Sequence, residues 1–185
     1  MDGNFEMNGL RPMLRLENST ICFVGFGNIA RNLYRKMRAF FGHVVAVDPY
    51  ITDRSMYPDV EFLELHEALS RADVVTMHLQ LTPATRGIIG EQEFQSMKPG
   101  VIFVNTARGG LVDEAALMRA LISYCALDVL GTENFSESPL LHRENVILTP
   151  HISWCSEAAL AELQKKTAQN VVETFLHGEP IYRAV

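Results

Sequence analysis

A glycine-rich run, GFGNIA at residues 25–30, constrains the fold of this chain more than any other part of its sequence. The run follows the apolar segment Ile21–Val24, which is typical of a buried strand, and it opens a helical pattern over Ile29–Phe41. The next apolar run, His43–Val47, predicts a second strand. Because a glycine turn between a buried strand and a helix begins a strand–helix–strand unit, the sequence predicts an α/β fold with parallel strands.

Short apolar runs and longer helical stretches continue to alternate along the rest of the chain, as in a parallel sheet with crossover helices. The residue patterns predict four more strands, at Asp73–His78, Val101–Asn105, Cys125–Val129 and Val146–Thr149. They also predict helices at Phe62–Ser70, at Glu91–Met97, directly after a capping Asp113, and at Trp154–Leu176.

The glycine-rich run has the spacing of a turn that binds a pyrophosphate. Gly25 allows the tight turn, and Gly27 lets the backbone approach a phosphate at the N-terminus of the helix that begins with Asn28 and Ile29. Ala30 is small enough for close packing of helix on strand. We therefore expect Gly25, Gly27, Asn28 and Ile29 to contact a dinucleotide in a Rossmann-type, doubly wound parallel sheet.

An acidic residue at the end of the second predicted strand supports this interpretation. Asp48 stands 18 residues after Ala30, close to the spacing at which a carboxylate reaches the ribose hydroxyls of adenosine. A carboxylate there would repel the additional phosphate of NADP, so the sequence predicts NAD as the cofactor. The alternative is that Asp48 caps or shapes a turn before Pro49.

Composition excludes several other classes of function. The 185 residues carry a formal net charge of −6 with no run of Lys or Arg, so no nucleic-acid partner is expected. No segment approaches the roughly 18 apolar residues of a membrane helix, and the first residues do not resemble a secretory signal. Cys22, Cys125 and Cys155 lack the spacing of a metal or redox pair. These features predict a cytoplasmic protein with no membrane partner and no metal site.

Six stretches, taken together and in order, carry a resemblance to a known family: VGFGNIAR, VDPY, LTPATRGIIG, MKPGVIFVNTARGGLVDEAAL, ALDV and ILTPHISW. From about Leu16 to its C-terminus, the chain resembles the D-isomer-specific 2-hydroxyacid dehydrogenases. The resemblance implies an NAD-dependent oxidoreductase that transfers a hydride between NAD and a small D-2-hydroxy acid or 2-keto acid. It also implies a homodimer.

The resemblance assigns catalytic roles to Arg108, Glu133 and His151. An imidazole can give or take the hydroxyl proton near neutral pH, and a neighbouring carboxylate favours its protonated form. An arginine offers a planar fork of donors that suits a substrate carboxylate. Taken singly, each is more simply explained as a solvated surface or loop residue. The family pattern further implies that the cofactor contacts Thr106, Ala107 and Asp128.

The family pattern also implies a domain organisation. Residues 1–15 are expected to be a remnant of an interdomain connection, and residues 16–152 to form the NAD-binding Rossmann domain. Residues 153–185 are expected to form a helix that returns toward a substrate domain. In the family that substrate domain begins before the cofactor domain, and we expect its N-terminal part to be missing from this sequence.

Departures from the family pattern keep a second hypothesis open. Gln80 and Asn134 stand where the family usually has proline, and the segment before Asp128 is shorter than usual. These changes affect the precision of the active site. The missing substrate domain motivates the alternative of a catalytically silent NAD-binding module, acting as a redox sensor or as an interaction protein like the corepressor relatives. A third possibility is that the chain is a piece of a longer enzyme.

Overall fold

The computed structural model describes residues 15–120, 122–132 and 134–183. The chain divides into two compact units, one that ends at Pro150 and one that comprises His151–Val185.

In the described part of the first unit, seven parallel strands form one sheet in the order β3-β2-β1-β4-β5-β6-β7. The chain leaves β1 toward one side of the sheet for β2 and β3, and then returns to the other side of β1 for β4. The sheet therefore has a topological switch point between β1 and β4, as a doubly wound fold requires. The strands are β1 (Thr20–Val24), β2 (His43–Val47), β3 (Val60–Phe62), β4 (Val74–Met77), β5 (Ile102–Asn105), β6 (Tyr124–Leu127) and β7 (Val146–Leu148).

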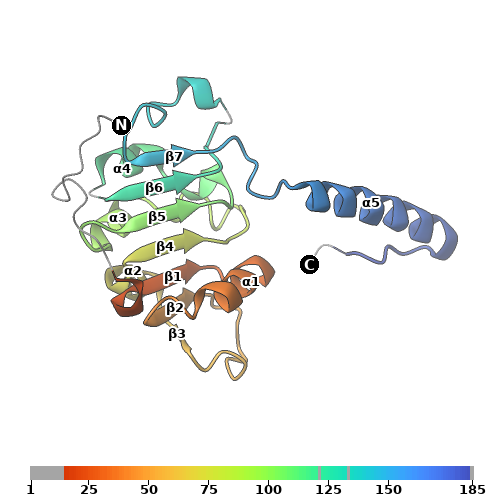
Figure 1. Ribbon diagram of the computed structural model, residues 1–185, viewed down its shortest axis with the longest axis horizontal. Helices are drawn as coiled ribbons and strands as arrows, with labels where there is room; N and C mark the ends of the chain where they lie inside the picture. Colours follow the sequence, from red (N-terminus) through yellow and green to blue (C-terminus); the bar gives the residue numbers. More distant parts are fainter. Residues whose placement is uncertain (1–14, 121, 133, 184–185) are drawn as a thin grey trace. The chain divides into compact units, whose positions relative to one another are not determined.

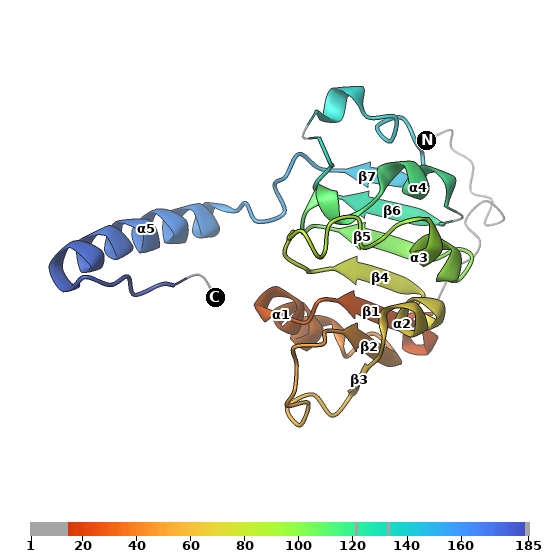
Figure 2. The same cartoon turned by 180° about the vertical axis from the view of Figure 1, so that it is seen from behind.

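Helices cover both faces of this sheet, as Figures 1 and 2 show from opposite sides. On one face lies α1 (Asn28–Met37), and on the other lie α2 (Leu65–Arg71), α3 (Glu91–Ser96) and α4 (Glu114–Arg119). Because both faces are covered, the central strands are mostly apolar, and every residue of β1 is buried. The predicted α/β, doubly wound architecture is confirmed.

Two hydrophobic clusters hold these layers together. The cluster under α1 is aromatic: the ring of Phe26 meets the rings of Tyr34, Tyr57 and Phe62 edge to face, at centroid distances of 5.1–5.8 Å. The cluster on the other face contains residues from five strands and from α2, α3 and α4, including Leu69. Burial of these side chains is what stabilises the stacking of helix on sheet.

The predicted boundaries of two helices of the first unit are wrong. The helix expected at Phe62–Ser70 begins at Leu65, since Phe62 belongs to β3 and pairs with Ala46 of β2. The helix expected to reach Phe41 ends at Met37. The chain then turns and buries Phe41 in the aromatic cluster, which a continued helix would not allow.

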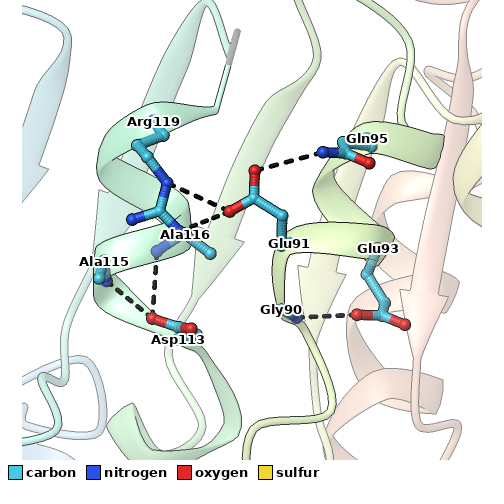
Figure 3. A network of polar contacts seen from close by, with 8 residues as sticks. All are labelled: Gly90, Glu91, Glu93, Gln95, Asp113, Ala115, Ala116 and Arg119. Atoms are coloured by element: carbon cyan, nitrogen blue, oxygen red, sulfur yellow. Dashed lines mark hydrogen bonds and ion pairs between the residues drawn. The ribbon is translucent and has the colours of Figure 1, made fainter.

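An exposed ion pair joins α3 to α4, and further polar contacts lie within each of these helices (Figure 3). Glu91 of α3 accepts hydrogen bonds from the Arg119 guanidinium of α4 and from Gln95 on its own helix. Asp113 caps α4, because its Oδ1 accepts from the amides of Ala115 at 2.9 Å and Ala116 at 3.1 Å. This cap confirms the helix start expected from the sequence.

The second unit contains α5 (Glu157–His177). The Ser156 hydroxyl caps its N-terminus by accepting from the Ala159 amide, so the helix begins three residues after the predicted Trp154. The helix ends at Gly178, which has a φ of +80°. Among the described residues, no helix is both long and apolar enough to cross a membrane.

Candidate cofactor site

The turn between β1 and α1 requires glycine at its first position. Gly25 has a φ of +90°, and its amide donates to the Val47 carbonyl of β2 at 2.9 Å. A β-carbon at this position would lie only 2.9 Å from the backbone carbonyl carbon of His78. Both the backbone conformation and the neighbouring strand therefore exclude a side chain at residue 25.

The second glycine of the turn has a different reason to lack a side chain. Gly27 is the N-cap of α1 with a φ of −74°, which any residue can adopt. A β-carbon built on it would have no protein atom within 4 Å. The exposed Asn28 and Ile29 follow, and no side chain caps the helix. The open space and the free amides of the first turn together suit a bound anion.

Asp48 is tied directly to this turn. Its Oδ2 accepts a hydrogen bond from the Phe26 amide at 2.9 Å, and its Oδ1 accepts from the Tyr50 amide at 3.0 Å. The second bond is the turn role that the sequence left open as an alternative. The first bond holds the carboxylate beside the glycine turn, so Asp48 serves both the turn and the candidate site.

The segment after β5 supplies the other side of the site. Thr106 and Arg108 are exposed and Ala107 is partly buried, and the Arg108 guanidinium donates to the Ala107 carbonyl at 2.6 Å. The next residue, Gly109, is packed against the chain that follows β6. A β-carbon there would lie 1.9 Å from the carbonyl carbon of Leu130, so this approach requires glycine.

Sequence reasoning missed Asn105, the last residue of β5. Its side chain is 1% exposed. Its Oδ1 accepts from the Ala107 amide at 3.0 Å, and its Nδ2 donates to the Arg108 carbonyl at 2.9 Å. The only signal in the sequence was a single asparagine at the end of an apolar strand. Roles were predicted for Thr106, Ala107 and Arg108, which follow it, but not for Asn105 itself.

A pocket of about 600 Å³ opens where the chain leaves β4 and β5, beside the start of α1. This is the edge of the sheet at the switch point, where doubly wound folds bind their ligands. Three residues expected at the cofactor, Ile29, Thr106 and Ala107, line it together with the predicted catalytic Arg108. Its remaining lining residues come from one segment: His78, Leu79, Gln80 and Leu81.

His78 stands between this pocket and the core. Its ring stacks on Phe23 with 5.8 Å between ring centroids, and its Nε2 lies 3.0 Å from the Thr76 hydroxyl. Burial lowers the pKa of His78 to about 4, because an imidazolium would lose its hydration there. The imidazole therefore stays neutral near pH 7 and lines the pocket as an uncharged group.

Asp128 follows β6 and is brought next to the Asn105 segment. Its amide donates to the Asn105 carbonyl at 3.0 Å, and its buried carboxylate accepts from the Thr149 hydroxyl. Glu133 lies outside the described residues.

His151 opens the second unit. It has a φ of +54°, a left-handed conformation that is uncommon for residues other than glycine. Its carbonyl accepts from the Trp154 indole at 2.9 Å, which gives Trp154 a local packing role. A strained backbone is frequent at functional sites, so the structure adds a physical reason to consider His151.

No cluster of potential metal ligands occurs among the residues that the structure describes. Cys22 and Cys125 are buried, and Cys155 is exposed. Burial raises the pKa of the Cys22 and Cys125 thiols to about 12, so both stay protonated and unreactive at neutral pH.

Most of the chain also matches the model of a known protein family. Residues 1–153 match the model of the D-isomer specific 2-hydroxyacid dehydrogenase, NAD binding domain. The chain belongs to this family. As a 2-hydroxyacid dehydrogenase NAD-binding domain, it carries the glycine turn and the residues after β5 within the matched range.

Similar curated proteins are longer than this chain. A D-3-phosphoglycerate dehydrogenase of Mycobacterium bovis is 41% identical over 174 residues, which are 90% of this chain and 32% of the relative. A glycerate dehydrogenase of Methylorubrum extorquens is 34% identical over 91% of this chain and 54% of its own length. The 2-hydroxyacid dehydrogenase domain therefore spans about a third to a half of these relatives.

Solved structures of the family share the fold. A glyoxylate reductase from Paecilomyes thermophila aligns with a TM-score of 0.84 at 32% identity, over 91% of this chain and 52% of that one. A D-lactate dehydrogenase with NAD+ from Lactobacillus jensenii aligns with a TM-score of 0.87 at 27% identity, over 99% of this chain and 60% of that one.

Proposed function

We propose that this chain binds NAD along the carboxyl edge of its sheet. The observation that carries the proposal is the combination at the β1–α1 turn. The space beyond Gly27 is open, the first amides of α1 are free, and Asp48 is fixed beside them. In this arrangement the amides would hold the pyrophosphate, Asp48 would bind the adenosine ribose, and the pocket of about 600 Å³ would receive the nicotinamide.

The proposed activity is reversible hydride transfer between the cofactor and a small D-2-hydroxy acid or 2-keto acid. The bound nicotinamide supplies or accepts the hydride. Arg108, at the pocket wall, pairs with the substrate carboxylate through two parallel hydrogen bonds and polarises the neighbouring carbonyl. The family membership and the names of the relatives support this substrate class.

The remaining two residues handle the proton. His151 donates a proton to the carbonyl oxygen during reduction and accepts one from the hydroxyl during oxidation. Glu133 favours the protonated imidazole through its negative charge. The left-handed backbone of His151 supports a functional role, since such strain is retained where the side chain has to be aimed.

Turnover tests this proposal. The purified chain is mixed with NADH and, in turn, with hydroxypyruvate, glyoxylate and pyruvate, and the nicotinamide absorbance is followed. At least one acid should oxidise NADH, and His151→Ala should lower the rate by a factor on the order of a hundred or more. His142→Ala, which alters an exposed histidine in the first unit, is the matched control and should keep the full rate.

Calorimetry on the same samples distinguishes the competing hypothesis. If NADH binds and no keto acid turns over or changes the heat of binding, the chain is a silent NAD-binding module and the proposed chemistry is wrong. If NADH does not bind to folded protein, both hypotheses fail.

We further propose a cytoplasmic homodimer. The buried free thiols Cys22 and Cys125 suit a reducing compartment, and the dimer follows from resemblance to the family. Light scattering on the purified chain tests the oligomeric state directly.

A further inference from the structure

Asn105 is the last residue of β5, directly before the segment 106–108 that carries Arg108. Its side chain is almost wholly enclosed, and it makes two hydrogen bonds to the backbone two and three residues ahead. The Asn105 carbonyl also accepts from the Asp128 amide on the neighbouring strand end at 3.0 Å. The residue is therefore anchored on one side to β6 and on the other to the segment 106–108.

The chemistry of the amide group explains why asparagine suits this place. The segment leaves the sheet at Asn105, so the Ala107 amide and the Arg108 carbonyl have no strand partner. One side-chain amide supplies an acceptor for the first and a donor for the second, at 3.0 Å and 2.9 Å. An aspartate would offer acceptors only, and a serine would be too short to span both groups.

The segment held in this way forms one wall of the pocket. Thr106, Ala107 and Arg108 all line it, opposite the segment that begins at His78. The glycine turn is held by separate bonds, from Gly25 to β2 and from Phe26 to Asp48. The two ends of the candidate cofactor site therefore depend on different hydrogen bonds.

We propose that Asn105 is a positioning residue, which fixes segment 106–108 in the shape that receives the nicotinamide end of the cofactor and aims Arg108. The inference rests on the proposed function. It deepens that proposal, because the Asn105 hydrogen bonds would hold the part of the site for the nicotinamide end, and the bonds of the glycine turn would hold the part for the ADP-ribose end.

The test compares two ligands that differ in the nicotinamide end. NADH carries the nicotinamide riboside and ADP-ribose lacks the nicotinamide, so calorimetry measures the dissociation constant of each with the same protein. Asn105→Ser should weaken NADH binding about tenfold, the effect of one or two lost hydrogen bonds. ADP-ribose binding should stay within about twofold of the wild-type value.

Asn105→Asp is the second variant, because it keeps the shape of the side chain and the acceptor for the Ala107 amide. It replaces the donor to the Arg108 carbonyl with a buried carboxylate oxygen that repels this carbonyl, so NADH binding should again weaken more than ADP-ribose binding. Circular dichroism shows whether each variant is folded, and only folded variants are compared with the wild type.

Asp73→Ala is the matched control for a general loss of stability. Asp73 lies at the opposite edge of the sheet, where its carboxylate accepts from the Thr20 amide at 2.8 Å and from Lys98 at 2.9 Å. This variant should lower stability and leave the ratio of the two dissociation constants unchanged. An equal change for both ligands in the Asn105 variants, or no change, overturns the inference alone. If wild-type protein binds neither ligand, the proposed function fails and the inference fails with it.

Discussion

The Asp48 carboxylate accepts a hydrogen bond from the Phe26 amide, with 2.9 Å between Oδ2 and the nitrogen. This bond joins the end of β2 to the middle of the glycine turn. It places a negative charge beside the N-terminus of α1, where an adenosine ribose would lie in the proposed complex. The carboxylate would accept hydrogen bonds from the ribose hydroxyls, and its negative charge would repel the 2′-phosphate of NADP.

Replacing this carboxylate should therefore change affinity and selectivity together. Asp48→Ala should weaken NADH binding by about tenfold to a hundredfold, the value of charge-assisted hydrogen bonds, and should weaken NADPH binding less. Titration with both nucleotides measures the ratio. Asp53→Ala removes an exposed acid that bonds Ser55 in the following loop, and it should leave both affinities unchanged. An unchanged NADH-to-NADPH ratio in Asp48→Ala would contradict the assignment.

The two glycines of the turn should respond differently to the same substitution. Gly25→Ala places a methyl group against the His78 backbone at a φ of +90°, so the free energy of unfolding should fall by about 2 kcal/mol or more. Gly27→Ala meets open space, so its stability should match wild type within about 0.5 kcal/mol. Its methyl group would nevertheless occupy the space assigned to the pyrophosphate. Urea denaturation and NADH titration of both variants check this; normal NADH affinity in Gly27→Ala would be evidence against the placement.

The partly buried imidazole of His78 should make stability depend on pH. Its pKa is lowered to about 4 in the fold, whereas a histidine in an unfolded chain titrates near about 6.5. Between these values the unfolded chain binds the proton and the folded chain does not. The free energy of unfolding should therefore decrease as the pH falls from about 6.5 toward 4, by up to about 3 kcal/mol. Above pH 6.5 His78 is neutral in both states, so this loss of stability is absent there.

Denaturation of wild type and His78→Gln at pH 7 and pH 5 measures this effect. The variant should lose less stability than wild type between the two pH values, because glutamine does not titrate. His142→Gln, at an exposed position, should behave like wild type. Equal losses in all three proteins would show that His78 is not the group responsible.

The contacts in Figure 3 should differ in their contribution to stability. Asp113→Ala removes the acceptor for two free amides of α4 and should cost about 1 kcal/mol. Arg119→Ala breaks an exposed ion pair with Glu91 and should leave the denaturation midpoint almost unchanged, because solvent screens such pairs. The reverse order of effects would refute this ranking.

Local spacing made the glycine turn predictable from the sequence. Gly25, Gly27 and Asp48 lie within one strand–helix–strand unit, so their proximity in the fold follows from their distance along the chain. The helix cap at Asp113 was predictable for the same reason. β3 was not: it has three residues, and Phe62 also continues an apolar pattern into α2. Sequence periodicity does not separate a short strand from the start of a helix.

The role of Asn105 could not be predicted from the sequence. It depends on which backbone groups leave the strand ladder where β5 ends, and on the pairing of β5 with β6 that brings Asp128 alongside. Both are properties of the folded sheet. The resemblance to the family named the residues that follow Asn105, but local spacing gives no reason to distinguish Asn105 from an ordinary strand end.

The central claim is that the carboxyl edge of the sheet, from the glycine turn to segment 106–108, binds NAD. Titration of the purified chain with NADH, followed by the increase in nicotinamide fluorescence, tests it most directly. The wild-type chain should bind one NADH saturably, with a dissociation constant on the order of micromolar, and Gly27→Ala should weaken this binding. Folded protein that binds neither NADH nor NAD at about 1 mM would contradict it.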